Sequence, residues 1–145
     1  MVMKRIVRAI NRGLPAAIPL RVFDPGQFTL SDLPRKTIGS GQCVDLVRRV
    51  CGLGHTSTWV AGDPVYGNTT LKPGTPIACF DGYGMYGNHT DGTSHAAIYL
   101  GPSTKYLGGI RIYDQWVGHT PAPRDISISG EGCNNVMSYA VVKTA

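Results

Sequence analysis

The sequence lacks the features that mark several large classes of protein. No apolar run in its 145 residues approaches the roughly 20 residues of a membrane-spanning helix, so no membrane span is expected. Only four cysteines are present, with neither a CxxC pair nor a zinc-type spacing, so we expect no metal and no cofactor. The chain shows no helix-turn-helix or zinc-finger spacing and no interleaving of aromatic with basic side chains, which argues against a nucleic-acid partner.

The N-terminal segment is basic and lacks an uninterrupted apolar stretch. Seven of the 14 Lys and Arg residues fall within the first 36 positions, and the whole chain carries a net charge of +5. A secretory signal needs roughly 7–15 unbroken apolar residues, whereas Arg5, Arg8 and Arg12 interrupt this segment. We expect residues 1–38 to form a basic arm or short helix that packs on a single domain of residues 39–145. If the protein works outside the cell, it would be made in the cytoplasm and exported without a cleaved signal peptide, and its charge would favour an anionic partner.

Glycine and proline are abundant, at 19 and 10 residues, which favours short strands and loops over a helix bundle. One helix is expected, with Ser40 as its N-cap and Gly52 at its end. Short strands are expected to follow at residues 76–80, 95–101, 109–117 and 136–143. One helix followed by consecutive strands with tight turns is typical of an α+β fold with a small antiparallel sheet.

Cys43 lies in the first turn of the expected helix, directly after the residues Gly-Ser-Gly-Gln. It belongs to a set of apolar residues at helical spacing, namely Cys43, Leu46, Val47, Val50 and Cys51. At the start of a helix, free backbone N–H groups and the positive end of the helix dipole favour a thiolate. Because a cysteine in an apolar stripe is more often a core residue, its position alone indicates only a candidate nucleophile.

A cysteine nucleophile also needs a base and a group that orients the base, and two residues have that chemistry. His95 opens an apolar strand, whose rigid backbone suits a catalytic base better than the loops that hold the other histidines. Asp114 lies inside the strand Ile-Tyr-Asp-Gln-Trp, where a carboxylate is costly unless it is paired. A histidine on the neighbouring strand would pair it. Each residue alone has a structural explanation, but the three occur in an order that one fold can bring together.

The segments GQCVDLV, SHAAIYLG and IYDQW, in this order, resemble the CHAP and NlpC/P60 superfamily of papain-like cysteine amidases, which cut bacterial peptidoglycan peptides. In particular, the chain looks like the small amidase effectors that bacteria inject into rivals through type VI secretion systems. The resemblance covers residues 39–116 and includes the segments TSTWVAGDPV and LKPGTPIACF. It implies a papain-like, NlpC/P60-type core in which the nucleophile helix packs on a small antiparallel sheet.

Carried over residue by residue, the resemblance implies that Cys43 is the nucleophile, His95 the general base and Asp114 the orienting residue. The backbone N–H of Cys43 is the expected oxyanion donor. Further oxyanion or substrate-binding candidates are Gln42, Trp59, Tyr83, His89 and Gln115.

The function implied is that of an antibacterial enzyme that cleaves an amide bond of the wall stem peptide through a thioester on Cys43. Its implied partners are the peptidoglycan stem peptide, the secretion apparatus and a cognate periplasmic immunity protein. It would act in the periplasm of the target bacterium.

Several alternatives remain open from the sequence. The same papain-like core carries acyltransferases and deamidases that act on lipids or proteins, and a flat hydrophobic surface beside the site would favour them. In a non-catalytic binding module, Cys43 would be a core residue that reacts slowly with alkylating reagents. The sequence leaves open which amide bond is cut, and whether Cys79 and Cys133 pair as a disulfide or stay as two buried thiols.

Overall fold

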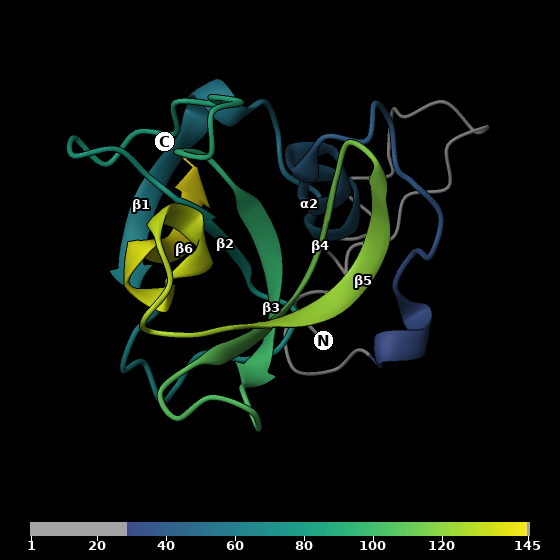
Figure 1. Cartoon of the computed structure of the whole chain (residues 1–145). Coiled ribbons are helices and arrows are strands. Elements are labelled where there is room, and N and C mark those ends of the chain that lie inside the picture. The colour runs from purple at the N-terminus through teal and green to yellow at the C-terminus, as the bar shows by residue number, and fades with distance from the viewer. Residues whose placement is uncertain (1–28, 145) are drawn as a thin grey trace.

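An antiparallel sheet of six strands forms the centre of residues 29–144, which are the residues that the computed structural model describes (Figure 1). The strands are β1 (Trp59–Pro64), β2 (Pro76–Cys79), β3 (Ala96–Pro102), β4 (Ile110–Trp116), β5 (His119–Ile126) and β6 (Tyr139–Thr144). Their order across the sheet is β1-β6-β2-β3-β4-β5. Every neighbouring pair is antiparallel.

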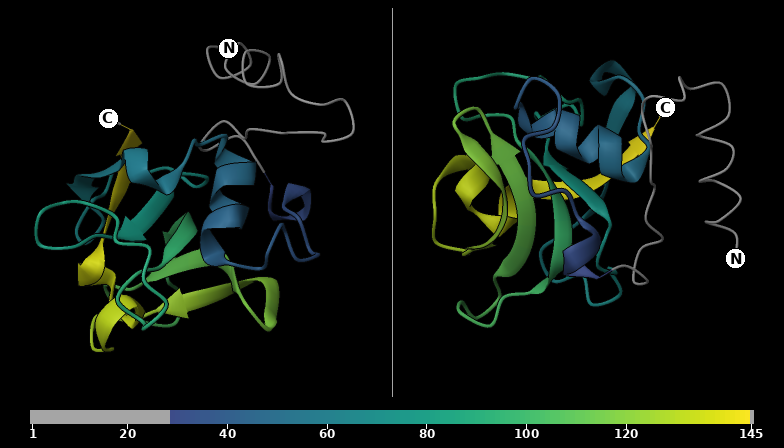
Figure 2. Two further views of the ribbon diagram at one scale, coloured as in Figure 1. Left: turned by 90° about the horizontal axis from the view of Figure 1, so that it is seen from above. Right: turned by 90° about the vertical axis from the view of Figure 1, so that its right-hand side faces the viewer.

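The single α-helix of the described residues, α2 (Cys43–Cys51), packs against β3 and β4 (Figures 1 and 2). Short 3-10 turns complete the described chain: η1 (Leu30–Asp32), η2 (Thr56–Thr58), η3 (Gly132–Asn134) and η4 (Val136–Ser138). The expected class, α+β with an antiparallel sheet, is confirmed. None of the helices among residues 29–144 is long and apolar enough to cross a membrane.

The four strands expected from the sequence are present as β2, β3, β4 and β6, whereas β1 and β5 were not expected. The missed strand β5 contains Pro121 and Pro123, and β1 ends in Pro64. Proline has no backbone N–H and therefore reads as a strand breaker. It is tolerated here because β1 and β5 are the two edges of the sheet, where one side of each strand needs no ladder hydrogen bonds.

The N-cap of the helix lies two residues later in the chain than expected. Gln42, and not Ser40, is the N-cap of α2, and its backbone is extended. Ser40 still binds the helix start, because its backbone N–H and its hydroxyl both donate to the Asp45 carboxylate, at 2.7 and 2.6 Å. At the other end, Gly52 adopts the left-handed conformation (φ 68°) and ends the helix as expected.

Of the expected basic arm, only residues 29–38 fall within the described chain. Leu33 is 3% exposed and packs in the core beside α2, so this part lies against the domain. The rest of the arm, residues 1–28, lies outside the described residues, and its expected structure stays a prediction.

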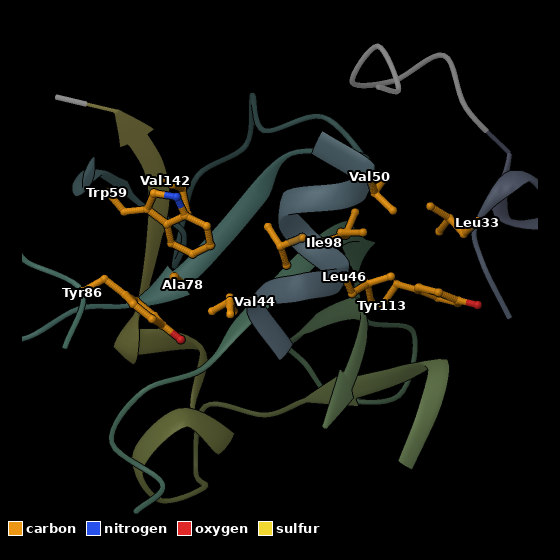
Figure 3. Close-up of a cluster of buried hydrophobic side chains, with 12 residues drawn as sticks. Leu33, Val44, Leu46, Val50, Trp59, Ala78, Tyr86, Ile98, Tyr113 and Val142 are labelled. Carbon is orange, nitrogen blue, oxygen red and sulfur yellow. The ribbon is translucent and has the colours of Figure 1, made fainter. Parts of the chain in front are cut away.

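Buried apolar side chains form two clusters, because alternate residues of β2, β3 and β4 point to opposite faces of the sheet. The first cluster lies between the sheet and α2, and Figure 3 shows Val44, Leu46 and Val50 of the helix within it. The second cluster is covered by the segment of η3 and η4, which contributes Cys133 and Val136. The nucleophile candidate therefore sits at the end of a helix that is fixed by a full hydrophobic face.

Trp59 belongs to the first cluster and has no exposed surface. Its ring centroid is 5.2 Å from that of Tyr86, and its indole Nε1 donates to the carbonyl of Gly54 at 3.3 Å (Figure 3). The expectation that Trp59 binds substrate is wrong, because a side chain without exposed surface offers none to a ligand.

Cys79 and Cys133 lie together in the second cluster, and both are free thiols in the structure. A hydrogen bond between them raises the pKa of Cys79 and lowers that of Cys133. Whether they oxidise to a disulfide in another compartment stays a prediction.

Truncating Trp59 tests its place in the core. Trp59→Ala should lower the free energy of unfolding by about 3–5 kcal/mol, the usual cost of removing a buried Trp or Phe side chain. Urea denaturation of the purified chain measures this value. The control is Tyr83→Ala, whose side chain is 93% exposed and which should change stability by no more than about 0.5 kcal/mol. An unchanged denaturation midpoint for Trp59→Ala would contradict the assignment to the core.

Candidate active site

Cys43, the first residue of α2, lies on the wall of a cavity of about 630 Å³. Its sulfur is 3.8 Å from the hydroxyl of Tyr86, with which it shares a hydrogen bond. His95 and the backbone of Ala96 also interact with the thiol and lower its pKa. The cysteine is thus partly exposed to the cavity and surrounded by hydrogen-bonding groups.

His95 immediately precedes β3, and its Nε2 lies 2.6 Å from Oδ2 of Asp114 on β4. This hydrogen bond makes Nε2 the donor to the carboxylate and leaves Nδ1 as the ring nitrogen that faces Cys43. The His95 side chain is 12% exposed and that of Asp114 is fully buried. The three residues predicted to act together are therefore contiguous in the structure.

Arg124 on β5 shares the Asp114 carboxylate with His95. Its Nε lies 3.2 and 2.9 Å from the two carboxylate oxygens, and its Nη2 lies 2.9 Å from Oδ2. Asp114 pairs directly with Ala122 in the β4–β5 ladder, so Arg124 is its diagonal neighbour on the same face. This charge-assisted fork offsets the cost of burying a carboxylate and fixes its direction.

The environment of Cys43 and His95 favours a thiolate beside an imidazolium. Burial alone disfavours the thiolate, but the hydrogen bond and charge of His95, helped by Ala96 and Tyr86, lower the pKa of Cys43 below its ordinary value. Burial also disfavours the imidazolium, but hydrogen bonds and charges from Asp114 and Cys43 raise the pKa of His95 to about 9. Both shifts stabilise the same ion pair, which is the reactive form of a cysteine nucleophile.

Gln115 lies next to Asp114 on β4 but points to the other face, and it has no exposed surface. Its Oε1 accepts from the backbone N–H of Ile38 at 3.0 Å. Its Nε2 donates to the carbonyls of Ile38 and Gln42, at 2.9 and 2.8 Å. The expectation that Gln115 binds substrate is wrong, because these bonds tie the segment before Cys43 to the sheet and leave no group for a ligand.

The other predicted binding residues divide between the cavity and the solvent. Gln42 and His89 line the cavity beside Cys43, and their contact with substrate stays a prediction. Tyr83 is 93% exposed and is not part of the cavity wall, so the structure does not bring it to the site.

Several residues of the site were not predicted. His55 was placed in a loop and was not counted among the site residues, but it lines the cavity together with Arg48 and Tyr86. Tyr86 belongs to the glycine-rich loop of residues 81–94, whose aromatic content was the available signal. Arg124 was missed because its strand, β5, was not predicted.

A second cavity of about 650 Å³ adjoins the first, and His95 lines it as well. Its wall includes Arg124, Glu131 and Cys133. His95 and Trp116 line both cavities, so the two hollows adjoin along these side chains. Within residues 29–144, no group of three or more His, Cys, Asp or Glu side chains is placed to hold a metal ion.

Comparison with known proteins gives consistent similarities. The family model for domesticated amidase effector 2 matches residues 25–141. A curated relative, the type VI secretion amidase effector 2 protein of Salmonella typhi, is 43% identical over 83 residues, which are 57% of this chain and 59% of that protein. The chain thus matches less than two thirds of this relative's length. A solved structure of type 6 secretion amidase effector 2 (Tae2) matches with a TM-score of 0.64 and 33% identity, over 78% of this chain and 89% of the other.

The ion pair predicts how Cys43 reacts with alkylating reagents. Iodoacetamide should modify Cys43 rapidly at mildly acidic pH, and the rate should fall only as the pH drops through the lowered pKa of Cys43. In His95→Ala the imidazolium is absent, so the profile should move up toward that of a free thiol, near a pKa of ~8.5. Mass spectrometry of the Cys43 peptide over a pH series measures both profiles.

The same digests contain their own control. Burial raises the pKa of Cys51, at the far end of the helix, to about 12, so this residue should stay unmodified throughout. A Cys43 profile that titrates as a free thiol and does not respond to His95→Ala would contradict the ion pair.

Proposed function

The chain belongs to the domesticated amidase effector 2 family, and on this premise we propose that it is a cysteine amidase that cuts the peptides of the bacterial cell wall. The observation that carries the proposal is the contact of Cys43 with a histidine whose other ring nitrogen is bound to a buried aspartate. We further infer a papain-like core. The helix-start cysteine and the strand-end histidine support this, as does the likeness to the Tae2 structure.

In the proposed mechanism, the Cys43 thiolate attacks the carbonyl carbon of the scissile amide and forms a carbon–sulfur bond. The backbone N–H of Cys43, in the first turn of α2, has no acceptor within the helix and can donate to the oxyanion that develops. The His95 imidazolium then donates its Nδ1 proton to the leaving amine, and the C–N bond breaks.

The resulting thioester is hydrolysed by water. His95, now neutral, takes a proton from the water as the oxygen attacks the thioester carbonyl. The C–S bond then breaks to release the Cys43 thiolate and a carboxylic acid, which loses its proton to solvent. Asp114 holds the imidazole in one orientation and stabilises its cationic form at both stages. Arg124 acts through Asp114 as a positioning residue.

The walls of the two cavities support a peptide substrate over a lipid. The wall next to Cys43 is rich in polar side chains, including Gln42, Asn88, His89 and Thr90. The second cavity adds Thr93, Glu131 and Asn134. An acyltransferase or deamidase that acts on a lipid or protein remains the second candidate, since the exposed apolar side chains of Trp116 and Val117 also line the cavity next to Cys43.

The setting of the activity is proposed from the names of the relatives and from the charge. We propose delivery by a type VI secretion system into the periplasm of a rival bacterium, where the net charge of +5 favours encounter with an anionic envelope. A cognate periplasmic immunity protein would protect the producer's kin, most simply by filling the cavity in front of Cys43.

Digestion of purified peptidoglycan tests the chemistry. Cys43→Ala should abolish the release of soluble fragments because the nucleophile is absent. Cys51→Ala, in the same helix but away from the cavity, should retain activity. Asp114→Asn should lower kcat by roughly 10²–10⁴-fold and leave a measurable rate, since orientation is lost while the nucleophile and base remain.

Mass spectrometry of the fragments identifies the amide bond that is cut. Full activity of Cys43→Ala would end the proposal of a cysteine amidase.

Expression in a bacterium tests the compartment. Fused to a periplasmic export signal, the protein should lyse the cell, and the same fusion carrying Cys43→Ala should not. Without the signal the cells should grow normally, because the proposed substrate lies outside the cytoplasmic membrane. Equal toxicity from the cytosol would show that the target is cytosolic and would favour the deamidase or acyltransferase alternative.

A further inference from the structure

Arg48, in the last turn of α2, contributes to the wall of the cavity in front of Cys43. Its Nε is buried and has no hydrogen-bond partner among the described residues. None of the ion pairs within residues 29–144 includes it. A buried donor without an acceptor costs free energy, and such a group in a cavity wall indicates a ligand that completes it.

Arg48 is placed to contact a substrate residue near the bond that Cys43 attacks. It follows Cys43 by five residues, which is a rise of about 7.5 Å along the helix axis. It lies one turn from Val44, which also lines the cavity, so both residues are on the same face of the helix. An extended peptide advances about 3.3–3.6 Å per residue, so this rise corresponds to about two substrate residues.

The part of the wall that the structure describes holds two cationic side chains, His95 and Arg48, and His95 is already paired with Asp114. Asp45 is the one acidic side chain among the described residues of the wall, and its Oδ2 is already occupied by the Ser40 N–H and hydroxyl. His55 accepts the Ser57 N–H at Nδ1, 3.1 Å away, so its neutral ring carries a proton on Nε2 and adds a donor. The nearby His89 is a further polar group of the same wall.

We propose that Arg48 forms a carboxylate-binding subsite, which selects wall peptides that carry a free carboxylate beside the scissile bond. This inference rests on the proposed amidase function. Stem peptides contain γ-linked D-glutamate and diaminopimelate, so free carboxylates flank their amide bonds, and each can also exist as a carboxamide. A guanidinium fork binds a carboxylate with two parallel charged hydrogen bonds. A carboxamide turns N–H donors toward the guanidinium donors and is disfavoured.

Substitution of the next residue, Arg49, is a matched control for a purely structural role of Arg48. Arg48 and Arg49 both lie in the last turn of α2, where a cation interacts favourably with the helix dipole. Arg49 is not part of the cavity wall. Removing either charge changes the helix and the net charge equally, so only Arg48 should affect the choice of substrate.

The test uses defined muropeptides of one sequence, prepared with either a carboxylate or a carboxamide next to the scissile bond. Wild-type kcat/KM should be roughly 10–100-fold higher for the carboxylate form. Arg48→Gln should lose this preference by slowing hydrolysis of the carboxylate form alone. Arg49→Gln should keep the preference, and Arg48→Lys, a point charge without the fork, should keep part of it.

The outcomes separate this inference from the proposed function. A wild-type protein that cuts both forms equally, or an Arg48→Gln variant that keeps the preference, would overturn the subsite. An equal loss in Arg49→Gln would also overturn it. If wild type cuts neither form, the proposed function fails. Calorimetry of muropeptide binding to Cys43→Ala then tests the subsite separately. The Cys43→Ala protein should bind the carboxylate form more tightly than the carboxamide form. The double variant Cys43→Ala, Arg48→Gln should bind both forms equally.

Discussion

Two adjacent polar residues of β4, both without exposed surface, hold the candidate site together. Because successive side chains of a strand point to opposite faces, Asp114 and Gln115 serve different elements. Asp114 binds His95, which immediately precedes β3, and Arg124 on β5. Gln115 binds the backbone just before Cys43. One short strand therefore fixes the base and the nucleophile relative to each other, and the cost of burying its polar groups is offset only while both sets of bonds are made.

Much of the fold follows from local patterns in the sequence, and the exceptions have physical causes. The helix at Cys43 and the strands β2, β3 and β4 carry the expected periodicity, and their packing agrees with it. The edge strands were missed because their prolines signal a break, and only the order of the sheet shows that an edge tolerates them. The helix start was placed too early because Ser40 binds Asp45 without being the N-cap, a distinction that the residue types alone do not make.

A site residue could be predicted where a polar side chain is expected to be buried and therefore needs a partner. A carboxylate inside an apolar strand demands a partner, and Asp114 indeed lies against His95. Trp59 and Gln115 were wrong as ligand contacts. An aromatic ring near a site can instead pack in the core, as Trp59 does, and an amide can instead bind the backbone, as Gln115 does. Arg48 was missed although it shares a helix with Cys43, because a charged side chain on a helix is usually solvated. His55 was missed because it lies in a loop, and only the folded chain brings its side chain to the same wall.

The central claim is that the Cys43 thiolate performs the chemistry, and substoichiometric alkylation tests it most directly. Samples treated with increasing iodoacetamide at mildly acidic pH are divided between peptide mass spectrometry and muropeptide hydrolysis. The remaining activity should equal the fraction of unmodified Cys43, and bound substrate should protect both the thiol and the activity. Undiminished hydrolysis by protein in which Cys43 is fully alkylated would contradict it.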